Sequence, residues 1–161
     1  MSTTKNKRRI MIIDDDEDIT NLFSIFLEHN GYIIDAYINP VEAFNNFNKN
    51  SHDLLILDLK MPNMDGMTLY HKIKEIDSNV IICFTTADIN YIQQLQKGIM
   101  DIEKIVLYKP VLLKDLKSKI DSLLLLSRQE EVKDKKLAMM VLWPNYFLFY
   151  NNNRGRNYFI Q

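Results

Sequence analysis

The stretch DLLILDLKMPNMDG, residues 53–66, joins a short apolar run to a polar turn and decides the fold class. The apolar run ends at Asp58, and Pro62 and Gly66 mark the turn that follows. An apolar run of this length without alternating polar residues is typical of a strand that is buried on both faces of a parallel sheet. Because ligands bind beyond the carboxyl ends of such strands, the carboxylate of Asp58 is placed for chemistry.

Similar short runs alternate with helical patterns from residue 9 to about residue 127. The expected strands are Arg9–Asp14, Tyr32–Ile38, Asp53–Asp58, Val80–Thr85 and Lys104–Tyr108. The expected helices are Glu17–His29, Pro40–Asn48, Met67–Ile76, Asp88–Lys97 and Leu112–Leu126. This alternation predicts an α/β protein with a five-stranded parallel sheet and helices on both of its faces.

Length and composition predict one globular domain with a short appendage. The 161 residues are 47% hydrophobic and 25% charged, with a net charge of −1, which provides no general attraction to nucleic acid or anionic membrane. We expect a basic lead-in at 1–8, the domain at 9–127, and a charged linker with an aromatic tail at 128–161. Cys83 is the only cysteine, and no secretory signal is visible, so the sequence suits the cytoplasm.

The tail after Ser127 allows three interpretations. The apolar segment 137–150 is shorter than the ~20 residues of a bilayer span and is interrupted by Pro144, so no transmembrane helix is expected. The last helix could extend through the charged stretch RQEEVKDKK, with the aromatic residues docked on the domain or on a twin subunit. Alternatively, the tail touches a membrane surface or is a disordered remnant.

Acidic residues also follow the first predicted strand. Asp14, Asp15 and Asp16 would share the carboxyl edge of the sheet with Asp58, where their like charges repel and a divalent cation relieves the repulsion. A site of oxygen donors without His or Cys favours Mg²⁺ or Mn²⁺ over zinc. We expect Asp15 to bind the metal, with Asp14 as its partner. Glu17 and Asp18 instead oppose the dipole of the first helix.

A carboxylate beside a metal can attack phosphorus and hold a phosphoryl group as an acyl phosphate, which is the role expected for Asp58. Lys109, at the end of the last strand, supplies a cation, and Thr86 supplies a hydroxyl for a phosphoryl oxygen. Lys60 and Asp88 should flank the mouth of the site with opposite charges and tune the lifetime of the phosphorylated state.

Four segments, IMIIDDDEDI, DLLILDLKMPNMDG, VIICFTTAD and LYKP, occur in this order between residues 10 and 110. Together they resemble the two-component response-regulator receiver domain, of the single-domain type. The resemblance implies a flavodoxin-like fold with strand order 2-1-3-4-5, and a histidine kinase or phosphotransfer protein as phosphoryl donor. It also implies an acidic pair, a phosphoacceptor, a switch hydroxyl and a phosphate-binding lysine, carried here by Asp14 with Asp15, Asp58, Thr86 and Lys109. Finally, it implies that the Lys60 carbonyl binds Mg²⁺ and that the Lys109–Pro110 peptide is cis.

The chain departs from the family at its output end. Val106 stands where the family usually has Tyr or Phe, and Tyr108 is the aromatic residue nearby. The roughly 34 residues after Ser127 show no helix-turn-helix pattern, so we expect no direct DNA binding. We expect output by contact with a downstream protein or a twin subunit, through the fourth helix, the last strand and the final helix.

Two other functional readings remain open. The run from Asp16 to Thr20 matches the DxDxT signature of haloacid-dehalogenase-type phosphohydrolases, with Asp16 as nucleophile, although the strand would then have to run through Asp14 and Asp15. A pseudo-receiver that works without phosphorylation is the third reading. In the receiver interpretation the chain assists only its own phosphorylation and dephosphorylation and is not expected to be an enzyme. The histidines, among them His52, lack partners in the sequence and are expected at the surface or at helix ends.

Overall fold

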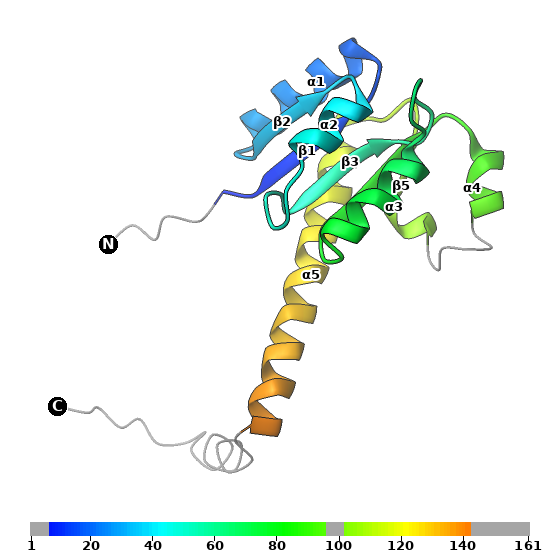
Figure 1. Ribbon diagram of the computed structural model, residues 1–161. Helices are drawn as coiled ribbons and strands as arrows, with labels where there is room; N and C mark the ends of the chain where they lie inside the picture. Colours follow the sequence, from blue (N-terminus) through cyan, green and yellow to red (C-terminus); the bar gives the residue numbers. More distant parts are fainter. Residues whose placement is uncertain (1–6, 96–101, 143–161) are drawn as a thin grey trace. The chain divides into compact units, whose positions relative to one another are not determined.

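The computed structural model describes residues 7–95 and 102–142 (Figure 1). The chain divides into two compact units, Met1–Leu124 and Leu125–Gln161. The first unit holds the sheet and the helices around it. The described part of the second unit is the continuation of the last helix. No helix in the described ranges has the length and apolar character to cross a bilayer.

Five parallel strands form one sheet in the first unit. They are β1 (Arg9–Ile13), β2 (Ile33–Tyr37), β3 (Leu54–Asp58), β4 (Ile81–Thr86) and β5 (Val106–Tyr108). Their order is β2-β1-β3-β4-β5, which confirms the predicted fold. All five residues of β3 are buried, as expected for a strand covered on both faces.

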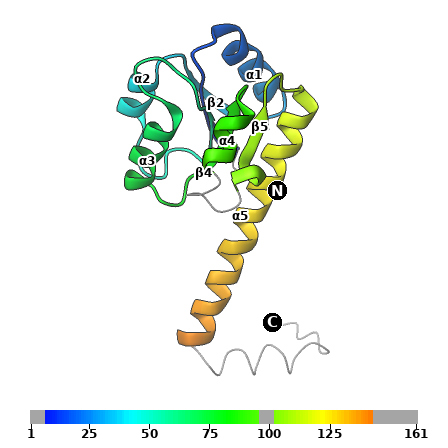
Figure 2. The same ribbon diagram turned by 90° about the vertical axis from the view of Figure 1, so that its right-hand side faces the viewer.

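Helices cover both faces of this sheet (Figure 2). They are α1 (Glu17–His29), α2 (Pro40–Asn46), α3 (Gly66–Ile76), α4 (Ile89–Leu95), a 3₁₀ helix (Ile102–Ile105) and α5 (Leu113–Leu142). Side chains of α2, α3 and α4 share one apolar core with the sheet. Those of α1 and the first turns of α5 form the other core. This layering leaves the carboxyl ends of the strands open for a site.

Several predicted boundaries were wrong, mainly towards the end of the chain. The last strand begins at Val106 rather than Lys104, because residues 102–105 form the 3₁₀ helix. The final helix ends at Leu142 rather than Leu126. Residues 128–136 are mainly Arg, Gln, Glu and Lys, which are good helix formers, and no Gly or Pro interrupts them. The helical interpretation of the charged stretch therefore holds to Leu142, and the aromatic residues from 143 onward lie outside the described residues, as do 96 and 97.

Local capping fixes the loops that frame the edge of the sheet. Asp16 caps α1 by accepting hydrogen bonds from the backbone N–H groups of Asp18 and Ile19. Asp65 caps α3 in the same way, through the N–H of Thr68. A Cβ atom on Gly66 would lie 2.3 Å from the carbonyl oxygen of Asp58, so only glycine allows α3 to begin this close to the end of β3.

His52 is not at the surface, contrary to the expectation from sequence. It is 9% exposed, and its Nε2 lies 2.8 Å from Asp35 Oδ2 while its Nδ1 lies 2.7 Å from Ser51 Oγ. Burial lowers the pKa of His52, and Asp35 opposes part of that shift. Asp35 lies in β2 and His52 lies just before β3, and β1 separates these two strands in the sheet. The pair could therefore not be predicted from the spacing of the two residues in the chain.

Candidate functional site

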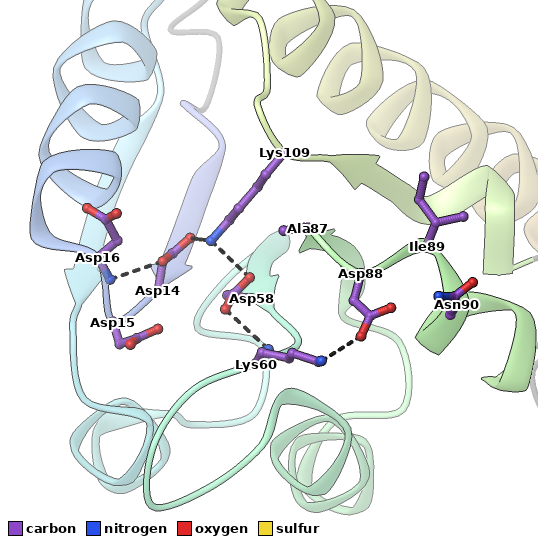
Figure 3. A pocket seen from close by; sticks show the side chains of 10 residues that line it. All are labelled: Asp14, Asp15, Asp16, Asp58, Lys60, Ala87, Asp88, Ile89, Asn90 and Lys109. Carbon is purple, nitrogen blue, oxygen red and sulfur yellow. Dashed lines mark hydrogen bonds and ion pairs between the residues drawn. The ribbon is translucent and has the colours of Figure 1, made fainter.

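A pocket of about 780 Å³ lies at the carboxyl ends of the strands (Figure 3). It is lined by residues at or just after the ends of β1, β3, β4 and β5 and by the first residues of α4: Asp14, Asp15, Asp16, Asp58, Lys60, Ala87, Asp88, Ile89, Asn90 and Lys109. Most of the residues expected from the sequence are thus brought together. Asp16 lines the pocket, as expected of the acidic cluster after the first strand. Ala87, Ile89 and Asn90 were not predicted to border the site; the signal for them was their position directly after a strand or after another site residue.

The centre of the site is a lysine shared by two buried carboxylates. Lys109 Nζ lies 2.7 Å from Asp14 Oδ2 and 3.0 Å from Asp58 Oδ1. Asp14 is 2% exposed and Asp58 is 4% exposed, so this ion pairing is shielded from bulk water. The remaining oxygens are also bound, because the backbone N–H of Asp16 donates to Asp14 Oδ1 and that of Lys60 donates to Asp58 Oδ2.

Burial and charge act against each other at this centre. Burial raises the pKa of Asp58, and the negative charge of Asp14 adds to the increase, while the hydrogen bond and charge of Lys109 oppose it. Burial also lowers the pKa of Lys109, but its two carboxylate partners outweigh this effect, so its pKa lies above the ordinary value. The raised pKa favours the charged form of Lys109, whereas burial disfavours the negative charge of Asp58 and Lys109 opposes this effect.

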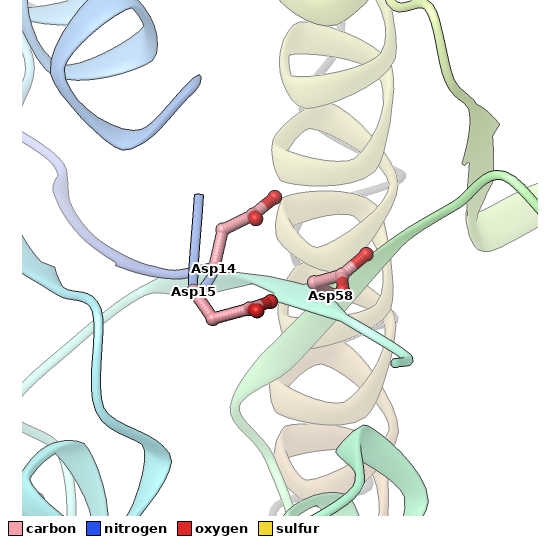
Figure 4. Close-up of side chains that lie close together, drawn as sticks. All are labelled: Asp14, Asp15 and Asp58. Carbon is pink, nitrogen blue, oxygen red and sulfur yellow. The ribbon is translucent and has the colours of Figure 1, made fainter. Parts of the chain in front are cut away.

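Asp15 completes an acidic group with Asp14 and Asp58 (Figure 4). Each of the three offers a carboxylate oxygen, and these oxygens all lie within 4.8 Å of one another. Asp15 is exposed, whereas the other two are buried, so the group opens toward the pocket. A donor set of oxygens alone suits Mg²⁺, and the excess of negative charge over the single Lys109 favours a cation.

Lys60 and Asp88 lie on the pocket wall as oppositely charged neighbours. Lys60 Nζ and Asp88 Oδ2 are 2.5 Å apart, and the ammonium also lies 5.9 Å from the centre of the Tyr91 ring. The expectation that the two residues flank the site with opposite charges is therefore confirmed. The ion pair also joins the loop after β3 to the loop after β4.

Thr86 is the one predicted site residue that does not line the pocket. It is 1% exposed, and its hydroxyl accepts a hydrogen bond from the backbone N–H of Asp88 at 3.1 Å. An accepting hydroxyl still has its own proton to donate. The cis peptide expected between Lys109 and Pro110 is present.

Val106 and Tyr108, the two residues of β5 that depart from the pattern expected for output, lie in different environments. Val106 is 4% exposed and packs in the core with α2, α3 and α4. Tyr108 is 42% exposed on the last strand.

The run from Asp16 to Thr20 has a structural role, because Asp16 caps α1 and the hydroxyl of Thr20 donates a hydrogen bond to the carbonyl of Asp14. This capping role argues against a nucleophilic Asp16.

A curated relative matches most of this chain. The chain is 29% identical over 135 residues to the transcriptional regulatory protein RprY of Bacteroides fragilis (strain YCH46), covering 81% of this chain and 55% of RprY. The chain thus spans about half the length of the curated relatives that it matches.

Solved structures share the fold over most of this chain. A CheY-like response regulator receiver domain protein from Methanospirillum hungatei JF-1 is 26% identical, with a TM-score of 0.68, covering 77% of this chain and 98% of that one. A two-component response regulator from Clostridium difficile is 31% identical, with a TM-score of 0.63 and coverages of 73% and 96%. The family model of the response regulator receiver domain matches residues 10–121. With the parallel sheet and the edge pocket described above, this match shows that the chain belongs to the response regulator receiver domain family.

Proposed function

We propose that the chain is a phosphoacceptor switch of the cytoplasm that receives a phosphoryl group on Asp58 from a histidine kinase or phosphotransfer protein. The observation that carries this proposal is the shared lysine: Lys109 contacts both Asp14 and Asp58 at the base of an open pocket. A cation there offsets the charge that accompanies an incoming phosphoryl group. A phosphorylation-independent interaction module would not need this buried and repulsive arrangement.

The transfer itself needs one nucleophile and fixed charges. A carboxylate oxygen of Asp58 forms a bond to phosphorus while the bond from phosphorus to the imidazole nitrogen of the donor breaks. The electron pair of that bond stays on the donor nitrogen. Lys109 binds a phosphoryl oxygen, and the hydroxyl of Thr86 donates to another once the end of β4 adjusts. The protein assists this transfer and the later hydrolysis, and turns over no other substrate.

Mg²⁺ is the cation that the acidic group fits. Asp14, Asp15 and Asp58, with the backbone carbonyl of Lys60, would hold it, and when bound it neutralises negative charge on phosphoryl oxygens. The carboxylate oxygens within 4.8 Å of one another support this assignment.

Replacing Asp15 with Ala should weaken Mg²⁺ binding by about tenfold or more, because a direct ligand is lost. Isothermal titration calorimetry with MgCl₂ measures the dissociation constant. Asp18→Ala is the matched control, since it removes an equal charge from the first turn of α1 without touching the acidic group. Equal Mg²⁺ affinity of Asp15→Ala and the native chain contradicts the assignment.

The Lys60–Asp88 pair should lengthen the lifetime of the phosphorylated state by screening the acyl phosphate from water. We expect the double variant Lys60→Ala, Asp88→Ala to lose its phosphoryl group several-fold faster, with little change in fold stability because the pair is exposed. Intact-mass analysis over time after removal of the phosphoryl donor measures the rate. Lys117→Ala, Asp121→Ala is the control, because that ion pair has the same 2.5 Å separation but lies on α5. If both double variants dephosphorylate at the native rate, the screening role is wrong.

Output by protein contact is proposed to use α4, β5 and the beginning of α5. Apolar side chains are exposed at this face: Ile89 is 57% exposed, Tyr108 42% and Leu112 56%. Phosphorylation would bias a two-state arrangement near Thr86, and a partner that binds one arrangement reads it. A twin subunit is one such partner, and a different downstream protein is the other.

The twin-subunit form predicts a larger mass after phosphorylation. Light scattering should show self-association of the phosphorylated native chain, and Leu112→Ser should reduce it because an exposed apolar contact is removed. Leu22→Ser, on α1 and 50% exposed, is the control for surface polarity. If the mass is the same with and without phosphate, only a heterologous partner remains.

A further inference from the structure

Thr85, in β4, carries a buried hydroxyl that the proposed reaction does not use. The residue is 0% exposed, and among the described residues of the chain its Oγ1 has no hydrogen-bond partner. A buried polar group without a partner lowers the stability of a fold and calls for an explanation, such as a partner in another state. The other core positions of β4 on this face are apolar, so packing alone does not require a hydroxyl here.

The sheet places Thr85 beside Asp58. Their Cα atoms are paired in the register of β3 and β4, and the N–H of Leu59 donates to the carbonyl of Thr85 at 3.0 Å. Side chains paired across adjacent strands point to the same face of a sheet. The next residue, Thr86, faces the other way, and its hydroxyl is already bound to Asp88. Thr85 therefore offers a free O–H on the face of the sheet that carries the Asp58 side chain.

The side chain of Lys109 extends from the end of β5 to the end of β3. Lys109 directly follows β5, yet its ammonium lies 3.0 Å from Asp58 at the end of β3. Because β4 lies between β3 and β5, the lysine must pass the end of β4 to reach Asp58. Thr85 thus lies on the strand between the two residues that this contact joins, at the position paired with Asp58.

We propose that Thr85 is a positioning residue whose hydroxyl donates a hydrogen bond to Asp58 once Asp58 is phosphorylated. This inference rests on the proposed phosphoacceptor function. The phosphoryl oxygens are more negative than the remaining acyl oxygen of Asp58, so they attract the ammonium of Lys109 away from it. The acyl oxygen of this state is Oδ1, which Lys109 contacts before phosphorylation and which then lacks a donor. The O–H of Thr85 takes that place without transferring its proton.

The consequence is a bias toward the phosphorylated state. The hydroxyl is unpaired before phosphorylation and paired after it, so the hydrogen bond adds to the stability of one state alone. A hydrogen bond that forms in only one of two states shifts the equilibrium toward that state by the free energy of the hydrogen bond. The same hydroxyl would also hold the Asp58 side chain in place for Lys109 and Thr86.

The test compares the native chain with Thr85→Val, which keeps the shape, and Thr85→Ser, which keeps the hydroxyl. Beryllium trifluoride with Mg²⁺ serves as the phosphoryl mimic, and calorimetry measures its dissociation constant. We expect Thr85→Val to bind the mimic about five- to tenfold more weakly, since tenfold corresponds to about 1.4 kcal/mol and one hydrogen bond is worth a similar amount. Thr85→Ser should bind like the native chain. Urea unfolding without the mimic should show Thr85→Val to be at least as stable as the native chain.

Two results with the Thr85 variants would contradict the inference. Native affinity in Thr85→Val overturns the inference, and so does equally weak binding by Thr85→Val and Thr85→Ser, because the hydroxyl would then be irrelevant. A native chain that does not bind the mimic overturns the phosphoacceptor function itself, and this inference with it. A purely structural role for Thr85 would change the urea midpoint but leave the dissociation constant for the mimic unchanged.

Discussion

Asp58→Asn should abolish the phosphoryl group that the native chain acquires from a small acyl-phosphate donor in the presence of Mg²⁺. The amide is a poor nucleophile and cannot form an acyl phosphate, whereas the carboxylate of Asp58 lies in the pocket beside Lys109. Intact-mass analysis should show one added phosphoryl group on the native chain, removed by hydroxylamine, and none on the variant.

The control for this experiment lies at the other end of the same strand. Asp53 directly precedes β3 and pairs with Arg8, away from the pocket, so Asp53→Asn should be labelled like the native chain. Asp58→Asn should remain folded, because an amide can still accept the hydrogen bond from the N–H of Lys60. Unchanged labelling of Asp58→Asn, or a hydroxylamine-stable modification, contradicts Asp58 as the acceptor.

Lys109→Met should destabilise the unphosphorylated fold by about 3–5 kcal/mol at pH 7 without divalent cations, because it leaves two buried carboxylates unpaired. Methionine keeps the length and the apolar stem of lysine, so the loss of charge dominates. Urea unfolding measures the free energy. Adding Asp58→Asn to Lys109→Met should recover much of the loss, since it removes one of the two unpaired charges.

The deficit of Lys109→Met should shrink as the pH falls. Burial already raises the pKa of Asp58, and Lys109 is the main influence that lowers it. Without the lysine, the folded variant holds a proton on Asp58 more readily than the unfolded chain does, so acid stabilises the variant relative to the native chain. The two unfolding curves should therefore approach each other between pH 7 and about pH 4. A deficit that is constant over this range, or additive with Asp58→Asn, contradicts the buried charge network.

Most of the fold could be predicted because its signals are local. The apolar runs predicted the strands, since burial on both faces requires a continuous stretch such as residues 54–58. Asp16 and Asn39 mark the beginnings of their helices through hydrogen bonds to N–H groups two and three residues ahead. Helix α5 shows the limit of this approach, because the change from apolar to charged composition allowed either a helix end near Leu126 or a continuation, and the structure continues the helix to Leu142.

Neighbouring residues in the chain were also sufficient to predict that Asp14, Asp15, Asp58 and Lys109 meet at one edge of the sheet. Each stands at the end of an apolar run, and the ends of parallel strands share one edge of the sheet. The contacts at the site depend instead on strand order. Lys109 reaches Asp58 across β4, Thr85 lies beside Asp58 with an unpaired hydroxyl, and His52 meets Asp35 away from the surface. Such contacts join residues far apart in the chain, and their geometry is set by packing of the whole sheet, so no local pattern encodes them.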